Sequence, residues 1–258
     1  MEVRLDFLVS KKHNLSRTRA QVLIKEGKVV TNGKIVTKPS FLVDENSNID
    51  IDLQENYVSR GACKLKKALE VFEVSMEGKI VLDMGASTGG FTQVCLENHA
   101  EKVYSVDVGE GELSPILVGD KRVVNMEKTD IRNVIQTRVA DTQIVVGDLS
   151  FISLKHILPK IKALFGKIEC ILLFKPQFEC GKAIAKISRG VIKDKSIHKT
   201  LLKEFLEEIK SYDFTLSNIT YSSIKGKSGN IEYLLHLNGK SAQPFNIEKV
   251  VDEAFKVL

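Results

Sequence analysis

The sequence predicts an α/β protein built on a mostly parallel sheet, with a small basic domain before it. From Lys79 onward, short apolar runs typical of buried strands alternate with amphipathic stretches typical of helices. The first run leads into a turn with three glycines and then a helix, which is how an open α/β sheet begins. Such sheets bind ligands at the carboxyl ends of their strands, so functional residues are expected there.

The first forty residues carry most of the positive charge. They contain nine lysines and arginines against three acidic residues, a charge of +6, whereas the whole chain of 258 residues carries +5. A basic segment of this size favours a polyanionic partner, although charge alone is explained equally well by a solvated surface.

Two helices, a hairpin and a further strand are expected in this basic segment. Ser16 can cap the second helix and Gly27 can close it, while Asn32-Gly33 is a strong hairpin signal. The expected elements are helices at Val3–Val9 and Arg17–Glu26, a hairpin of Val29–Thr31 and Ile35-Val36, and a strand near Asn48–Ile51.

The stretches "RLDFLV", "LSRTRAQVLIKEGKVVTNGKIVTKPS" and "IDI" resemble the small RNA-binding module of the ribosomal S-four type, also called the alpha-L motif. The resemblance implies an α+β domain that presents a rigid basic face to RNA phosphates. The candidate RNA-binding residues are Arg4, Arg17, Arg19, Lys25 and Lys34, with Arg60 beyond the module.

A second domain is expected after a polar linker. We place the module at residues 1–54, the linker at 55–58 and the second domain at 59–258. Ser59 can cap a helix at Arg60–Phe72, with Lys64 off its apolar stripe. The later elements expected are strands at Lys79–Asp83, Lys102–Asp107, Val123–Asn125, Gln143–Gly147, Glu169–Lys175, Phe214–Tyr221 and Asn230–Leu237, helices at Gly90–Asn98, Leu154–Phe165 (broken at Pro159), Ser196–Ser211 and Ile247–Val257, and a loop from Pro176 to about Lys193.

The glycine turn reads D-x-G-x-x-x-G-G, which is neither the G-x-G-x-x-G of a nicotinamide site nor a Walker loop. Asp83 at the strand end disfavours a pyrophosphate and suits a cation such as the ammonium group of an amino acid. The pattern resembles the first motif of S-adenosylmethionine-dependent methyltransferases, although a glycine turn of another α/β protein stays an alternative. The candidate cofactor-binding residues here are Asp83, Gly85, Ala86, Ser87, Gly89, Gly90 and Phe91.

Two acidic residues after the next strands extend this candidate site. Asp107 ends the second strand, where acids often bond ribose hydroxyls. Asp130 follows the third strand, where it could meet an adenine amino group. For both, the alternative is an ordinary cap of a helix or loop.

Four further residues lie in stretches that resemble one family. The stretches "YVSRGACKLKKALEVF", "VLDMGASTGGFTQVCL", "VYSVDVGEGEL", "VGDLSFISL", "LFKPQFE" and "GKSGNIEYLLHL" resemble the TlyA family, which joins an S-four-type module to an FtsJ-like domain and includes proteins labelled haemolysins. The resemblance implies a Rossmann-like S-adenosylmethionine-dependent methyltransferase fold with a mostly parallel seven-stranded sheet. It carries the Lys-Asp-Lys-Glu tetrad of FtsJ-type ribose 2′-O-methyltransferases over to Lys64, Asp148, Lys175 and Glu232; Cys63 stands where many relatives have His.

The tetrad suits this chemistry on physical grounds. A ribose hydroxyl has a high pKa, so a base must remove its proton as the methyl group arrives. A lysine can do so only if burial or a nearby cation lowers its pKa. We expect Lys175 to be the base, Lys64 the nearby cation, and Asp148 and Glu232 the groups that orient both amines. No metal is required.

The resemblance implies ribosomal RNA as partner and a cytidine as target. The chain begins directly at the module, as shorter members do, which favours the large subunit over the small one. The charged start, the lack of a long apolar run and the unpatterned cysteines indicate a cytoplasmic protein with reduced thiols. Two alternatives stay open: a membrane-active haemolysin, and a non-catalytic ribosome-assembly factor.

Overall fold

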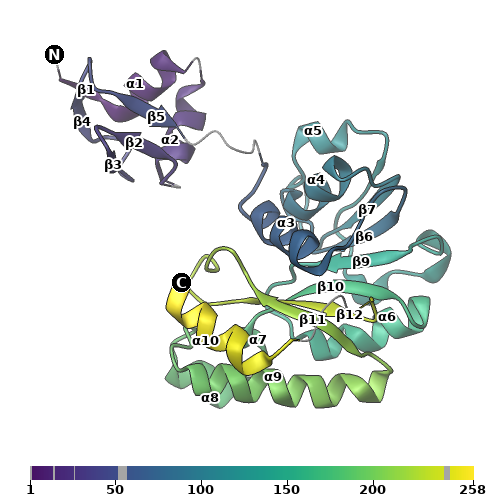
Figure 1. Cartoon of the computed structure of the whole chain (residues 1–258). Helices are drawn as coiled ribbons and strands as arrows, with labels where there is room; N and C mark the ends of the chain where they lie inside the picture. The colour runs from purple at the N-terminus through teal and green to yellow at the C-terminus, as the bar shows by residue number, and fades with distance from the viewer. Residues whose placement is uncertain (1, 14, 26, 52–56, 241–244) are drawn as a thin grey trace. The chain divides into compact units, whose positions relative to one another are not determined.

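The computed structural model describes residues 2–13, 15–25, 27–51, 57–240 and 245–258. The chain divides into two compact units, residues 1–56 and residues 57–258, and Figure 1 draws both. Of the linker predicted at residues 55–58, residues 55 and 56 lie outside the described ranges, so its bounds stay a prediction.

The first unit is a small α+β domain with two short antiparallel sheets, β1–β4 and β3–β2–β5. Its core contains apolar residues of both helices, among them Leu5, Leu8, Leu23 and Ile24. Its elements are β1 (Glu2–Arg4), α1 (Leu5–Lys12), α2 (Arg17–Lys25), β2 (Val29–Thr31), β3 (Lys34–Ile35), β4 (Leu42–Asp44) and β5 (Ile49–Ile51).

The predicted cap, hairpin and last strand of this unit are confirmed. The Oγ of Ser16 accepts a hydrogen bond of 3.2 Å from the backbone N–H of Arg19. Asn32 and Gly33 form the hairpin turn with positive φ angles of 48° and 76°. The helix predicted at Val3–Val9 was wrong at its start, because Val3 pairs with Val43 of the unpredicted strand β4.

The second unit contains a seven-stranded sheet in the order β11–β12–β10–β9–β6–β7–β8. β12 runs antiparallel to both neighbours, and the other neighbouring pairs are parallel, which confirms the predicted mostly parallel sheet with one reversed strand. The strands are β6 (Ile80–Met84), β7 (Lys102–Val106), β8 (Val123–Met126), β9 (Ile144–Gly147), β10 (Glu169–Phe174), β11 (Leu216–Tyr221) and β12 (Tyr233–Leu237).

Helices cover both faces of this sheet (Figure 1). The first face is covered by α3 (Gly61–Phe72), α4 (Gly90–Glu97) and α5 (Pro115–Val118). The opposite face is covered by α6 (Leu158–Phe165), α9 (Lys195–Ile209) and α10 (Ile247–Val257).

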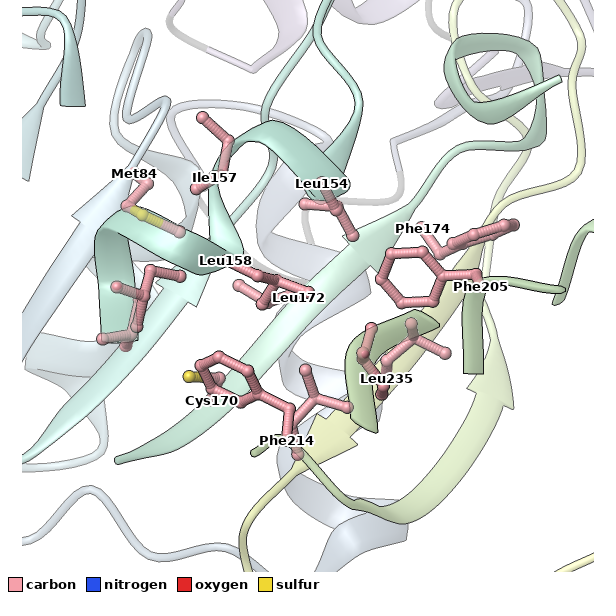
Figure 2. Packing of buried hydrophobic residues seen from close by; sticks show 14 of the residues in the cluster. Met84, Leu154, Ile157, Leu158, Cys170, Leu172, Phe174, Phe205, Phe214 and Leu235 are labelled. Atoms are coloured by element: carbon pink, nitrogen blue, oxygen red, sulfur yellow. The ribbon is translucent and has the colours of Figure 1, made fainter. Parts of the chain in front are cut away.

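The alternation of side chains along β10 supplies both apolar cores. Ile171 and Leu173 join the core under α3 and α4, whereas Cys170, Leu172 and Phe174 join the other. Figure 2 shows this second core, in which the rings of Phe174 and Phe205 meet edge to face with centroids 5.1 Å apart. Because β10 is buried on both faces, the residue that follows it is held by a rigid strand.

The segment around Pro159 is divided as expected, with the break lying just before the proline. The 3₁₀ turn η3 (Leu154–His156) precedes α6, and Pro159 occupies the first turn of α6, where a missing N–H has no helical partner to lose.

The loop predicted from Pro176 was wrong in part, because it contains two short helices, α7 (Pro176–Glu179) and α8 (Gly181–Ile187). Pro176 is suited to the first position of α7, and Ile184 and Ala185 pack α8 against the core. The remaining turns are the 3₁₀ helices η1 (Ile131–Asn133), η2 (Gln136–Arg138) and η4 (Lys210–Tyr212).

No helix in the described ranges is both long enough and apolar enough to cross a membrane.

Candidate active site

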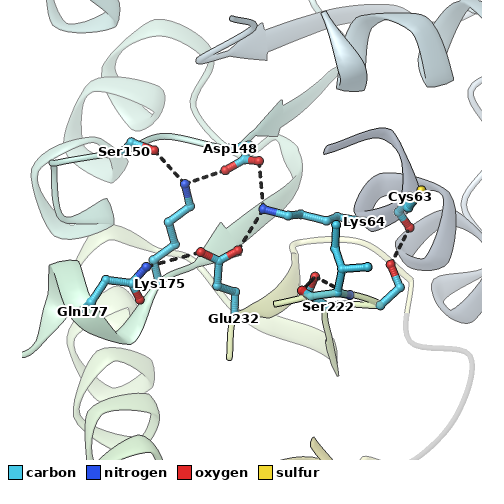
Figure 3. Close-up of polar contacts among 10 residues, drawn as sticks. Cys63, Lys64, Asp148, Ser150, Lys175, Gln177, Ser222 and Glu232 are labelled. Atoms are coloured by element: carbon cyan, nitrogen blue, oxygen red, sulfur yellow. Dashed lines mark hydrogen bonds and ion pairs between the residues drawn. The ribbon is translucent and has the colours of Figure 1, made fainter. Parts of the chain in front are cut away.

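Four charged side chains from distant parts of the second unit meet at one edge of the sheet (Figure 3). Lys64 comes from α3, Asp148 follows β9, Lys175 follows β10 and Glu232 immediately precedes β12. Because β12 is antiparallel, its beginning lies at the same edge as the carboxyl ends of β9 and β10. The topology therefore assembles the four residues that the sequence placed in separate motifs; we call them the tetrad.

Asp148 joins the two lysines. Its Oδ1 lies 2.6 Å from the Nζ of Lys175, and its Oδ2 lies 3.2 Å from the Nζ of Lys64. The Nζ of Lys64 also donates to the Oε2 of Glu232 at 2.8 Å. One carboxylate thus holds both amines, while the second carboxylate contacts Lys64.

The tetrad is largely withdrawn from water. The side chains of Lys64, Lys175 and Glu232 are buried, and that of Asp148 is 20% exposed. Burial alone would lower the pKa of Lys64, but the carboxylates of Asp148 and Glu232 outweigh it and raise that pKa. Burial would raise the pKa of Asp148, but the two ammonium groups outweigh it and lower that pKa. Lys64 is therefore a fixed cation and Asp148 a fixed anion at neutral pH.

Three other side chains support the tetrad, and the motifs did not single them out. The Nζ of Lys175 donates to the Oγ of Ser150 at 2.9 Å, and the Nε2 of Gln177 donates to the Oε1 of Glu232 at 3.3 Å. The ring of Phe178 lies 5.7 Å from the Nζ of Lys175. Ser150 and Gln177 each lie two residues after a tetrad member, at the end of a buried strand, and this spacing is the signal that could have found them.

The loop before β12 lies tightly against Glu232. A Cβ atom at Gly226 would meet the Oε1 of Glu232 at 2.3 Å, so a side chain there would displace the carboxylate. The backbone of Ser222 also donates to the carbonyl of Glu232 at 2.8 Å. The absence of a side chain at Gly226 thus leaves room for the carboxylate of Glu232 in its place beside Lys64.

Two cavities meet at the tetrad. The glycine-turn cavity has a volume of about 970 Å³, and the tetrad cavity has a volume of about 610 Å³ and is lined by all four tetrad residues. Both are lined by the same short set of residues: Gly85, Ser87, Asp148, Ser150, Phe151, Gln177 and Phe178. A molecule in the first cavity can therefore reach a molecule in the second across this shared wall.

Phe151 is the most exposed large side chain in the shared wall. Its side chain is 91% exposed, its φ is +63°, and its ring lies 5.3 Å from that of Phe178. Apart from this contact with Phe178, the ring is left in water by a left-handed backbone conformation, so burial does not explain its presence. It is a functional candidate that the sequence motif "GDLSF" contained but did not distinguish from a core residue.

The glycine turn has the close approaches that its sequence indicates. Gly85 has a φ of +78°, and a Cβ there would meet the carbonyl oxygen of Asp148 at 3.0 Å. At Gly90 a Cβ would meet the Oγ of Ser59 at 2.1 Å and the backbone N of Ala62 at 2.9 Å. Ser59 consequently contacts the turn, and its predicted role as a side-chain cap of α3 was wrong, because α3 has no side-chain cap.

The predicted cofactor residues divide between the two cavities. Gly85, Ser87, Asp107 and Asp130 line the glycine-turn cavity. Ala86, Gly90 and Phe91 line the tetrad cavity, whereas Asp83 and Gly89 line neither of the two.

Asp83 is fully buried behind the turn. Its Oδ2 accepts a hydrogen bond of 2.7 Å from the Oγ1 of Thr92, which lies 2.8 Å from the Oγ of Ser105. Its Oδ1 has no partner among the described residues. Burial raises the pKa of Asp83 to about 7, although the hydrogen bond from Thr92 opposes the change. Contact between Asp83 and a ligand's ammonium group stays a prediction.

Asp107 and Asp130 both bond to protein groups. Asp107 accepts hydrogen bonds of 2.8 Å from the backbone N–H groups of Ser87 and Gly109, so it ties the turn to the second strand. Asp130 caps η1 and forms an ion pair with Arg132, whose hydrogen bond lowers the pKa of Asp130. The cap that was one alternative for Asp130 is thus present, and its predicted contact with adenine stays a prediction.

The predicted RNA-binding residues differ in their surroundings. In the first unit, Arg4 and Arg17 both bind Asp6, at 2.9 and 3.3 Å. Lys25 and Lys34 are exposed, and Arg19 is half-buried. In the second unit, exposed Arg60 lines the tetrad cavity together with Lys225 and Lys227.

Comparison with known proteins identifies a family for each of the two units. The model of the FtsJ-like methyltransferase family matches residues 57–239, and that of the S4 domain matches residues 3–49. The chain is 39% identical to the 23S rRNA (cytidine-2′-O)-methyltransferase TlyA of Campylobacter jejuni, over 91% of this chain and 98% of that protein. It is 34% identical to the 16S/23S rRNA (cytidine-2′-O)-methyltransferase TlyA of Mycobacterium tuberculosis, over 94% and 92%.

A solved structure is similar over the whole chain. It is a protein of Streptococcus thermophilus, described provisionally as a hemolysin, with 36% identity and a TM-score of 0.77 over 99% of this chain and 96% of that one.

Proposed function

The chain belongs to the FtsJ-like methyltransferase family, and from this premise we propose that it transfers a methyl group from S-adenosylmethionine to the 2′-hydroxyl of a cytidine in ribosomal RNA. We propose the large subunit as its preferred substrate, because the relative from Campylobacter jejuni is named for 23S rRNA alone. The observation that carries the proposal is the tetrad, whose two amines and two carboxylates lie where the two cavities meet.

S-adenosylmethionine fits the lining of the glycine-turn cavity. The volume of about 970 Å³ is ample, since small-molecule sites usually span roughly 300–1,000 Å³. The absence of a side chain at Gly85 lets a ligand lie against the backbone, and Asp107 offers carboxylate oxygens at the place where ribose hydroxyls are bound in related folds. When bound there, S-adenosylmethionine supplies an electrophilic methyl group.

Each tetrad residue has its own role in the transfer of the methyl group. The raised pKa of Lys64 keeps it protonated, so it cannot accept a proton and acts as a fixed positive charge. Lys175, once neutral, accepts the proton of the ribose 2′-hydroxyl while that oxygen forms its bond to the methyl carbon. Asp148 holds both amines, and Glu232 neutralises Lys64 on its other side.

Binding of the large RNA substrate is assigned to the S4 domain and to the cations around the tetrad cavity. Lys25 and Lys34 can approach phosphates from the first unit, and Arg60, Lys225 and Lys227 can do so from the second. Because ribosomes are the substrate, we place the enzyme in the cytoplasm. The hemolysin description of a similar protein does not displace this proposal, since it leaves the buried tetrad unexplained.

The proposal is tested by mapping methylated riboses. Purified protein, labelled S-adenosylmethionine and ribosomal subunits from cells lacking the gene should give one or a few 2′-O-methylated cytidines. These resist alkaline cleavage, because that cleavage needs a free 2′-hydroxyl. Lys175→Arg should lower turnover by roughly 10³-fold or more, because a guanidinium stays protonated and cannot act as a base.

Binding measurements complete this test. Lys175→Arg should still bind S-adenosylmethionine and RNA, because its defect lies in the transition state. Near-normal methylation by Lys175→Arg would exclude Lys175 as the base, and absence of methylation by the wild type on every ribosomal substrate would overturn the function. Lysis of red cells in buffer free of S-adenosylmethionine, with Lys175→Arg as active as the wild type, would favour the hemolysin instead.

A further inference from the structure

We propose that Ser150 is a positioning residue that aims the amine of Lys175 at the substrate hydroxyl. The inference rests on the proposed function and extends it to a residue outside the tetrad. Ser150 lies two residues after Asp148, and its Oγ lies 2.9 Å from the Nζ of Lys175. Figure 3 shows the amine between Ser150 and Asp148.

The geometry of an amine gives this contact its importance. Nitrogen in a lysine side chain has three directions besides its bond to Cε. In Lys175 one of them faces the Oγ of Ser150, which accepts a hydrogen bond of 2.9 Å, whereas the Oδ1 of Asp148 forms an ion pair at 2.6 Å that lacks hydrogen-bond geometry. When Lys175 is neutral, Ser150 can accept one N–H group while the carboxylate of Asp148 attracts the other, so the lone pair turns toward the remaining direction. Since Lys175 lines the tetrad cavity, that direction is available to the ribose hydroxyl.

Asp148 alone could not fix this direction. An ion pair without hydrogen-bond geometry lets the amine rotate about its last side-chain bonds, so the lone pair would point toward the hydroxyl only part of the time. Glu232 is engaged elsewhere, because its Oε2 accepts from Lys64 and its Oε1 accepts from Gln177. Ser150 therefore supplies the second fixed point that Lys175 needs.

The surroundings of Ser150 argue against a purely structural role. Ser150 is exposed, it lines both cavities, and among the described residues its hydroxyl bonds to Lys175. An exposed serine that loses a hydroxyl usually changes stability little. The cost of removing this hydroxyl should therefore appear in the rate of methyl transfer.

The experiment compares Ser150→Ala and Ser150→Thr with the wild type in single-turnover methyl transfer at saturating RNA and S-adenosylmethionine. Ser150→Ala should lower the rate about 10- to 100-fold, as expected when a reacting group is misaligned. Its dissociation constants for both substrates should stay within twofold of the wild type. Ser150→Thr keeps the hydroxyl and should restore most of the rate. The matched control is Ser211→Ala in η4, which removes a hydroxyl that donates to the carbonyl of Glu208 and should leave the rate unchanged.

The dependence of the rate on pH distinguishes orientation of the Lys175 amine by Ser150 from a purely structural role of Ser150. Lys175 faces Asp148 and, through it, Lys64; Glu232, Arg60, Lys225 and Lys227 also line the cavity, and all of these groups are unchanged in the variant. Because Ser150→Ala removes a contact of the amine and no charged group, its rate should lie below that of the wild type at every pH.

Three results would overturn the inference. The first is a Ser150→Ala rate within twofold of the wild type at every pH. The second is a rate defect that disappears when the concentration of S-adenosylmethionine is raised, which would make Ser150 a cofactor contact. The third is Ser150→Thr as slow as Ser150→Ala with binding intact. A wild type that is inactive on all ribosomal RNA would instead overturn the proposed function.

Discussion

The same charge pattern occurs in both units of this protein, with different consequences. In the first unit the carboxylate of Asp6 holds Arg4 and Arg17; in the second the carboxylate of Asp148 holds Lys64 and Lys175. The arginine side chains are 45% and 53% exposed, whereas those of the lysines are 9% and 8% exposed. Arginine is always charged and remains hydrated here, so the first cluster can only hold structure and attract phosphate. Lysine can lose its proton when buried, so the second cluster can do chemistry.

A third buried aspartate shows what the cations contribute. Asp6, Asp83 and Asp148 are all withdrawn from water to a large degree, and only Asp83 lacks an ion pair among the described residues. The hydrogen bond from Arg4 lowers the pKa of Asp6, and the two lysines lower that of Asp148, whereas burial raises the pKa of Asp83 to about 7. The partner of a buried carboxylate, more than its depth, therefore decides whether it is charged.

The strongest test of the difference between the Asp6 cluster and the Asp148 cluster is to remove the charge from each aspartate in turn. Asp148→Asn should lower methyl transfer by roughly 10²–10⁴-fold, because both amines lose the group that orients them. Asp6→Asn should leave transfer at saturating RNA near the wild-type rate and destabilise the first unit by about 1–3 kcal/mol, the cost of disrupting a buried hydrogen-bond network. Single-turnover rates and hydrogen exchange of residues 2–51 measure the two effects.

Circular dichroism controls for global unfolding of Asp148→Asn. Loss of catalysis in folded Asp6→Asn at saturating RNA would show that the first cluster takes part in chemistry. The two clusters would then no longer differ in role.

A second prediction concerns how three cations of the first unit, exposed Lys25 and Lys34 and half-buried Arg19, bind RNA. Replacing Arg19, Lys25 and Lys34 by glutamine should weaken RNA binding and reduce the slope of log K against log salt by about one for each phosphate that is no longer neutralised. Fluorescence anisotropy at several salt concentrations measures the slope, and binding of S-adenosylmethionine serves as the control. A slope equal to that of the wild type would remove this face from the interface.

A third prediction is a pH dependence of stability caused by Asp83. Its pKa is raised in the folded protein to about 7, so between its ordinary value near 4 and about pH 7 the folded state binds more protons than the unfolded state. The free energy of unfolding of the second unit should therefore fall as the pH rises through this range, by an amount on the order of a few kcal/mol.

Asp83→Asn keeps an acceptor for Thr92 without the charge and should remove this slope. Urea unfolding of both proteins at pH 4.5, 6 and 7.5 tests the effect. Parallel profiles for the two proteins would show that Asp83 stays ionised when folded.

Much of the site could be predicted from local sequence because strand ends carry it. Asp148 and Lys175 follow runs of buried apolar residues, and in a parallel sheet such ends meet at one edge. Contacts that depend on tertiary packing could not be predicted from the sequence. The strand β1 was missed because Val3 extends only through its pairing with Val43, and the position of Ser59 follows from the close approach of α3 to Gly90. The exposure of Phe151 and the bond from Lys175 to Ser150 likewise depend on the assembled fold.

The place of β12 in the sheet governs when this enzyme becomes active during its own synthesis. β12 lies between β10 and β11 and is made after both, and Glu232 at its beginning contacts Lys64, 168 residues earlier in the chain. A chain emerging from the ribosome can fold its first unit early, but it cannot complete the tetrad until residues near 237 have left the exit tunnel. A nascent chain that has folded its first unit but not yet added β12 therefore lacks a complete tetrad, so methylation has to wait for β12 to join the sheet.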